Sequence, residues 1–409
     1  MASLHEKLKY FCLITDMHLI NTEAAALEFA TDAGLLPRED EAPPPCPKCQ
    51  APMRSNKRKE SKLGWRWVCS LRNRNNCSGM INPIENTFFE GTKIPIREAL
   101  VITVYFVLDH SFSYINQQLK LWREKQKLPV IANETIVDFL SYCREVCEIF
   151  ASHHSRMLGG KGKSILIDET FLTRRKYNRG RVTKNMTIVV LGIYCREDKE
   201  GLFFKVKGKS KRHLWPYIKR HVHPETTFIY TDSAPQYKRI ENLFPAATHK
   251  TTNHKKGVFV DPDDKQNTIN DLEGENKLFK RSIKSKRTDD ICTQYMAVHY
   301  YRRFRLKPFT YDGERLAQFL QDIKAVYPGH GKVGLELKML DEPTSESEGI
   351  EDLMPPKKSA RQDDDIPFIQ EDDDKWEFNQ KTEPRKQKDG NVAKMLHIFY
   401  RKSCRSKMS

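Results

Sequence analysis

The chain has 409 residues, 38% hydrophobic and 30% charged, with a formal net charge of +16 and a pI of about 9.2. This length allows two or three domains, and the positive charge favours a polyanionic partner. No run of about 18 apolar residues is present, which argues against a membrane span. Residues 1–15 lack a clean signal-peptide pattern, so the ten cysteines are interpreted as reduced thiols and metal ligands. We therefore expect a cytosolic or nuclear protein, nuclear if its source is a eukaryote.

The N-terminal segment, residues 1–40, has apolar residues at helical spacing and is predicted to be helical. The next segment, residues 41–95, contains four cysteines: Cys46, Cys49, Cys69 and Cys77. Their pairing is typical of a zinc ribbon, in which four thiolates hold Zn²⁺ in a closed structural site. Seven residues separate the last two cysteines, which is longer than usual. Basic residues between 57 and 74, Lys62 among them, are expected to contact DNA phosphates; contact with another protein is the alternative.

Residues 96–158 are predicted to form helices over Ile96–His110, Ser113–Arg123 and Glu134–His153. The starts of the second and third helices are spaced like a helix-turn-helix, which could read the end of a DNA element. An ordinary helical spacer is the alternative interpretation.

Between residues 160 and 310 the hydrophobic period changes to that of a mixed sheet. The predicted order is strand, strand, strand, helix, strand, short strand and long helix. These elements cover Ser164–Phe171, Met186–Cys195, Leu202–Val206, Lys211–Val222, Thr227–Thr231, residues 247–258 and a helix from Thr268. This order predicts an α/β (α+β) protein with an RNase H-like catalytic domain.

Two of these strands run directly into an aspartate, Asp168 and Asp232. A third carboxylate is expected from the helix that begins near Thr268, where the candidates are Asp271, Glu273 and Glu275. Three such carboxylates, brought together, suit a two-ion site for Mg²⁺ or Mn²⁺, since these cations prefer oxygen ligands.

Two neighbours of these acids have predicted roles of their own. Glu169 follows Asp168 on the opposite face of its strand and is interpreted as structural. Gly274 costs its helix about 1 kcal/mol of propensity, which predicts a close backbone approach there.

Basic residues near the predicted site are expected to bind DNA, with a solvated run of charge as the alternative. They are Arg174, Arg175, Lys176, Arg179 and Arg181 in a predicted hairpin, and Lys277, Lys280 and Arg281 on the later helix. The stretch from Lys280 to Arg287 could also serve as a nuclear localisation signal. Residues 328–409 are acidic and then basic, and are predicted to be a largely disordered tail.

Several of these stretches resemble DDE transposases of the Merlin superfamily and related bacterial insertion-sequence transposases. They are residues 167–171, 176–181, 230–237 and 252–254, and the resemblance covers roughly residues 44–305, including the N-terminal zinc ribbon. In that family a third motif contains asparagine, then glutamate and glycine, then a tryptophan. Asn270, Glu273 and Gly274 match it, and Asn276 stands in place of the tryptophan. Some relatives use asparagine or histidine as third ligand, so Asn270 stays an alternative to Glu273.

The resemblance implies a cut-and-paste transposase that acts as a homodimer or larger homo-oligomer on terminal inverted repeats and target DNA. Two Mg²⁺ ions held by Asp168, Asp232 and Glu273 would activate water against the phosphodiester and stabilise the leaving 3′ oxygen. The freed 3′-OH would then attack the target. Alternatives are a domesticated transposase-derived DNA-binding protein without cleavage, a nuclease without strand transfer, and a zinc-ribbon interaction factor without an enzyme domain.

Overall fold

The computed structural model describes residues 3–72, 77–153, 157–173, 187–252, 268–283, 289–338 and 341–354. All of them belong to one compact unit, Met1–Ile366. The predicted basic hairpin with Arg174 to Arg181, the stretch 284–288 and the tail from residue 355 lie outside the described residues. Within the described ranges, none of the helices has the length and apolar character needed to cross a bilayer.

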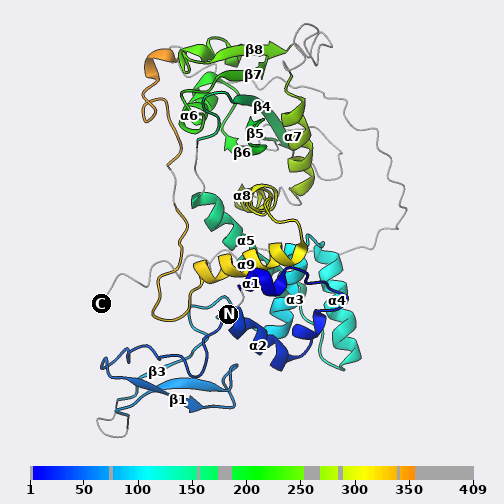
Figure 1. Cartoon of the computed structure of the whole chain (residues 1–409), viewed down its shortest axis with the longest axis vertical. Helices are drawn as coiled ribbons and strands as arrows, with labels where there is room; N and C mark the ends of the chain where they lie inside the picture. The colour runs from blue at the N-terminus through cyan, green and yellow to red at the C-terminus, as the bar shows by residue number, and fades with distance from the viewer. Residues whose placement is uncertain are drawn as a thin grey trace, which may run out of the picture. The chain divides into compact units, whose positions relative to one another are not determined.

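A five-stranded sheet forms the centre of the domain that begins near residue 157 (Figure 1). Its strand order is β6-β5-β4-β7-β8. The strands span Ser164–Thr173 (β4), Thr187–Cys195 (β5), Glu200–Val206 (β6), Phe228–Asp232 (β7) and Thr248–Thr252 (β8). β4, β5 and β6 pair antiparallel, whereas β7 runs parallel to β4 and β8 parallel to β7. This is the RNase H-like arrangement expected from the order of elements, and the predicted α/β class is confirmed.

The two faces of the sheet are covered by different helices, α6 (Lys211–His221) and α7 (Asn270–Ser282), which lie on opposite sides in Figure 1. Successive side chains of a strand point to opposite faces. Accordingly Ile165 and Ile167 of β4 share a core with α6, whereas Leu166 shares one with α7. Even-numbered residues of β4 therefore face α7, which decides where Asp168 points.

The helical part of the molecule has one core to which distant segments contribute. Its helices are α1 (Leu4–Leu8), α2 (Glu23–Asp32), α3 (Ile96–Val107), α4 (Phe112–Lys125), α5 (Asn133–His153) and α9 (Asp312–Val326), with the end of α8 (Asp289–Tyr300) and the π-helical turn Tyr301–Arg305. The sequence predicts residues 1–40 and 96–158 as separate domains, and the shared core corrects that boundary.

One contact explains why the N-terminal segment joins this core. The carboxylate of Glu23 accepts hydrogen bonds from the backbone N–H groups of Ile96 and Arg97, at 2.9 and 3.0 Å. The first N–H groups of a helix have no partner within it, and a carboxylate there also complements the helix dipole. α2 thus supplies a cap for α3, which begins after Pro95 and whose own N-cap position offers no side-chain hydrogen bond.

Residues 341–354 pack on the sheet domain, although their composition predicts that they belong to the disordered tail. Ile350 is only 3% exposed and lies in the core shared with α6. Arg220 of α6 donates to Glu348 at 2.8 Å, and Lys207 pairs with Glu342 at 2.7 Å. The acidic side chains that indicate disorder supply partners for a basic surface, which corrects the prediction for these fourteen residues.

The ribbon segment forms a small antiparallel sheet, β1-β2-β3. Its strands are β1 (Met53–Lys57), β2 (Trp65–Cys69) and β3 (Met80–Ile81). Short 3-10 turns complete the described structure at Met17–Leu19 (η1), Pro235–Tyr237 (η3), Ile240–Asn242 (η4) and Glu351–Leu353 (η7).

Candidate active site and metal centre

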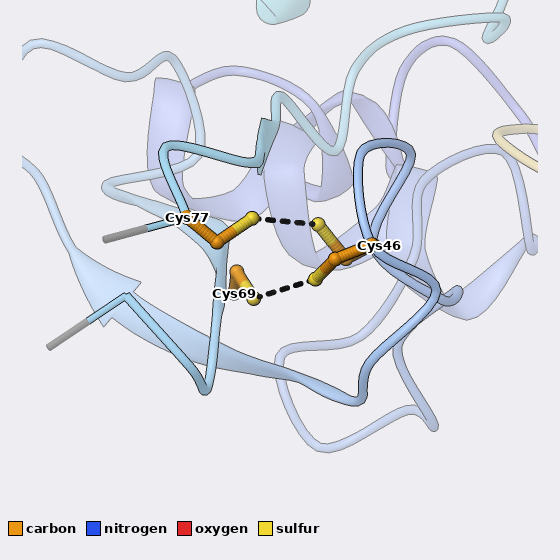
Figure 2. Close-up of side chains that lie close together, drawn as sticks. Cys46, Cys69 and Cys77 are labelled. Atoms are coloured by element: carbon orange, nitrogen blue, oxygen red, sulfur yellow. Dashed lines mark hydrogen bonds between the residues drawn. The ribbon is translucent and has the colours of Figure 1, made fainter. Parts of the chain in front are cut away.

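The four ribbon cysteines gather at one end of the β1-β2-β3 sheet. Their sulfur atoms all lie within 4.8 Å of one another. The Sγ atoms of Cys46 and Cys77 are 3.7 Å apart, and those of Cys49 and Cys69 are 3.5 Å apart. Figure 2 shows the sulfur atoms of Cys46, Cys69 and Cys77 directed toward a common centre.

This spacing fits zinc. Four sulfur atoms at the Zn–S distance of about 2.3 Å from a tetrahedral centre are about 3.8 Å from each other. The observed separations are close to that value. The cysteine cluster could thus bind Zn²⁺, and with all four positions taken by protein its role would be structural.

One basic residue of the ribbon segment, Lys62, also makes hydrogen bonds within the protein. Lys62 donates to the backbone carbonyl groups of Thr92 and Ile94, the latter at 3.4 Å, and its side chain is partly buried. Burial lowers the pKa of Lys62. The ammonium of Lys62 thus ties the ribbon to the segment that follows it, and its contact with DNA stays a prediction.

Asp168 and Asp232 lie on neighbouring parallel strands. The register of these strands pairs Leu166 of β4 with Tyr230 of β7, and each aspartate follows two residues later on the same strand face. Leu166 and Tyr230 share a core with Leu272 of α7. Because adjacent strands are about 4.8 Å apart, the two carboxylates emerge side by side toward α7.

The electrostatics of Asp168 reflect this crowding of acids. Burial raises the pKa of Asp168 well above its usual range, and the adjacent charge of Glu169 raises it further. The charges of Asp232 and Glu273 act in the same direction. Repulsion of this kind marks a place where a cation would be stabilised.

The oxygen atoms of these carboxylates nevertheless do not all lie within 4.8 Å of one another in the structure. Among the described residues, the ribbon cysteines are the one group of three or more potential ligands whose atoms all lie within 4.8 Å. Asp232 accepts the backbone N–H of Ala234 at 3.0 Å, which fixes one of its oxygens. The donor chemistry fits a hard divalent cation such as Mg²⁺, with Asp168, Asp232 and Glu273 as the residues that would hold it.

The acids of α7 differ in their surroundings. Asp271 is exposed and accepts a hydrogen bond from Arg196 Nε at 2.9 Å. Glu275 is buried and paired with Arg303. Asn270 is exposed at the first turn of the helix. The charge of Glu273 contributes to the raised pKa of Asp168, which agrees with its predicted place as the third carboxylate.

Asn276 is distinguished in the sequence only as a replacement for tryptophan. Its Nδ2 donates to Oδ2 of Asp168 at 3.2 Å, and its side chain is buried. It follows Glu273 by three positions, so both project from the same face of α7. The spacing of three positions from Glu273 is the one feature of the sequence that could have placed Asn276 in the carboxylate site. A lone asparagine in a polar helix gives no further indication of such a role.

A glycine of β5 allows α7 to come this close. Gly192 pairs with Asp168 in the β4–β5 register. A Cβ atom at Gly192 would lie 3.1 Å from Leu272 Cδ1 and 3.4 Å from Asn276 Oδ1. By contrast, a Cβ at Gly274 would have no atom within 4 Å. The close approach predicted for Gly274 is therefore wrong, and the required glycine is Gly192.

Glu169 supports the site from the other face of the sheet. It accepts hydrogen bonds from Tyr237 Oη at 2.6 Å and Gln236 Nε2 at 3.2 Å. Burial raises the pKa of Glu169, although the bond from Tyr237 opposes the shift. Both partners lie in η3, four and five residues beyond Asp232, so Glu169 links the ends of β4 and β7. The structural interpretation of Glu169 is confirmed.

The predicted DNA-contacting residues fall into two groups. Lys277, Lys280 and Arg281 are exposed on α7. Arg174, Arg175, Lys176, Arg179 and Arg181 lie outside the described residues. In the helical core every residue of α3 is buried, so a DNA contact from this region would have to come from α4 or α5.

The domain described above is similar to a known family. Residues 157–303 match the family model of the ISXO2-like transposase domain, which supports a DDE transposase family for this segment. No curated protein matches the chain. Among solved structures, a chain of the simian T-cell lymphotropic virus intasome in complex with PP2A regulatory subunit B56 gamma is 12% identical. The match covers 64% of this chain and 78% of that one with a TM-score of 0.21, which is too low to bear on fold or function.

Proposed function

We propose that this protein is a cut-and-paste DNA transposase of the Merlin superfamily. The observation that carries the proposal is the convergence of Asp168 and Asp232, at the ends of adjacent parallel strands, on the helix that holds Glu273. The match of this same segment to an ISXO2-like transposase domain supports it.

In this proposal Asp168, Asp232 and Glu273 would hold Mg²⁺ or Mn²⁺, ions that supply an activated water and neutralise charge developing on the phosphate. The chain's own contribution is to hold three carboxylates close together, on a sheet edge stiffened by Glu169 and Tyr237. Hydrolysis at the end of the element frees a 3′-OH, and attack of that hydroxyl on a target phosphodiester forms a new phosphodiester while the target's own 3′-OH leaves.

The DNA would be held by basic residues around this edge. Lys277, Lys280 and Arg281 extend along α7 from Glu273, so phosphates bound there pass the carboxylates. The basic hairpin with Arg174 to Arg181 is proposed to contact the same duplex. Pairing of two element ends calls for at least a homodimer, and we propose a nuclear location in a eukaryotic source.

The test needs DNA that the protein itself selects. Zinc-loaded full-length protein is used to enrich bound duplexes from a randomised library, and the enriched duplexes become substrates with Mg²⁺. Wild type is expected to cleave them and to join the 3′ ends to a target plasmid. Asp232→Ala is expected to bind the same duplexes without cutting them.

Each failure has a distinct meaning. Cleavage without joining would favour a nuclease of the same fold. Equal binding and no cleavage by both proteins would favour a domesticated DNA-binding protein. The asparagine at position 276, where the resembling family has tryptophan, is the observation that keeps this second candidate open.

A further inference from the structure

The amide of Asn276 is placed in the carboxylate site with one of its two polar atoms unused. Nδ2 donates to Oδ2 of Asp168 at 3.2 Å. The residue is 6% exposed, and Oδ1 has no hydrogen-bond partner among the residues that the structure describes. Buried polar atoms almost always have a partner, so the unpaired oxygen needs an explanation.

The orientation of this amide follows from its neighbours. With Asp168 ionised, as cation binding requires, turning the amide over would place Oδ1 against a carboxylate oxygen, and two acceptors repel each other. Gly192 lies beside the oxygen, at a position where a Cβ would be 3.4 Å from Oδ1. Glu273 lies one turn earlier on the same helix face. Oδ1 is therefore fixed beside the acids that are proposed to hold the cation.

An asparagine at position 276 destabilises the fold unless its Oδ1 receives a hydrogen bond from a donor outside the described residues. A leucine side chain of similar size would fill the same space without leaving a buried oxygen unpaired. The missing donor must be small enough to enter between α7 and β5, and it must be attracted by the surrounding acids. A hydrated divalent cation meets both conditions, because Mg²⁺ and Mn²⁺ commonly keep several of their waters when bound.

We propose that Asn276 is a positioning residue of the cation site, an inference that rests on the proposed function. Its Nδ2 holds Asp168 in the orientation that receives the ion, and its Oδ1 accepts a hydrogen bond from a water molecule of the hydrated cation. Groups that orient metal ligands in this way change metal affinity by about 10–100-fold when they are removed.

The experiment measures Mn²⁺ binding by calorimetry on zinc-loaded full-length protein without DNA. Acidic runs at residues 363–365 and 372–374 can also bind Mn²⁺, so Asp168→Asn defines the background. Asn276→Leu is expected to weaken the Asp168-dependent binding about 10–100-fold. The matched control is Leu278→Gln, an exposed position on the same helix, which is expected to bind Mn²⁺ like wild type.

Melting temperatures separate a positioning role from a structural one. Without Mn²⁺, Asn276→Leu loses both the unpaired oxygen and the hydrogen bond to Asp168, so it is expected to melt close to wild type. Asn276→Asp, which repels Asp168, is expected to melt lower without Mn²⁺ and to gain more on its addition than wild type does.

The inference is overturned if Asn276→Leu binds Mn²⁺ as tightly as wild type, or if Leu278→Gln loses as much affinity. Should Asn276→Leu fail to fold, Asn276→Asp decides, and a Mn²⁺-induced rise equal to that of wild type would be the contrary result. Absence of any Asp168-dependent binding in wild type would instead refute the proposed function, and this inference with it.

Discussion

Substitution of Gly192 by alanine tests the packing that brings α7 onto the sheet. The added methyl group would lie 3.1 Å from Leu272 Cδ1 and 3.4 Å from Asn276 Oδ1. Leu272 is fully buried, so its methyl group has no empty space to move into. Overpacking of this kind costs about 1–3 kcal/mol, and the loss of a glycine from the unfolded chain offsets about 0.4–1 kcal/mol of it. We expect a net loss of about 1 kcal/mol, the middle of the range that these two values allow.

Gly274→Ala is the matched control on the same interface. Its Cβ would have no atom within 4 Å, and alanine in place of glycine within a helix gains about 1 kcal/mol. The assay is native-state hydrogen exchange of β5 and α7 peptides, since it reports the opening free energy of this region alone. Gly192→Ala is expected to lower the opening free energy of β5 and α7, and Gly274→Ala is expected to raise it. Unchanged protection of β5 in Gly192→Ala would refute the packing argument.

The remaining predictions concern charge, the 341–354 segment and zinc. Because the pKa of Asp168 is raised on folding, its ionisation opposes folding: without added Mg²⁺, Asp168→Asn should melt higher than wild type at neutral pH. That advantage should shrink as pH falls through the raised pKa and vanish below the unfolded value of about 3.9; a pH-independent difference would contradict it. Ile350→Ala should lower the opening free energy of α6 peptides in hydrogen exchange by about 2–5 kcal/mol, whereas no change would mean that residues 341–354 do not pack on this domain. Cys77→Ser should remove exchange protection from β1–β3 and leave β4–β8 unchanged; full protection of β2 would argue against a structural zinc site.

The sheet domain is predictable from the sequence because its signals are local. Strands such as β5 are rich in β-branched residues with the period of a sheet, and α7 has its apolar residues at helical spacing. Strand alternation alone also assigns Asp168 and Glu169 to opposite faces. The order of the elements then restricts the topology to very few choices.

The remainder depends on contacts between distant residues, which no local pattern encodes. The cap that Glu23 supplies to Ile96 joins segments 73 positions apart. Residues 341–354 have a composition typical of disorder, yet Glu348 pairs with Arg220 across 128 positions. Lys62 donates to two carbonyl groups 30 and 32 positions away, those of Thr92 and Ile94. Asn276 shows its role only once Asp168 is placed opposite it.

The most direct test of the central claim is an anomalous diffraction measurement on crystals of the zinc-loaded protein soaked in Mn²⁺. We predict manganese density that contacts Asp168 and Asp232, with Glu273 of α7 as the third carboxylate. Manganese found only elsewhere, or a Glu273 side chain turned away from an occupied site, would contradict it.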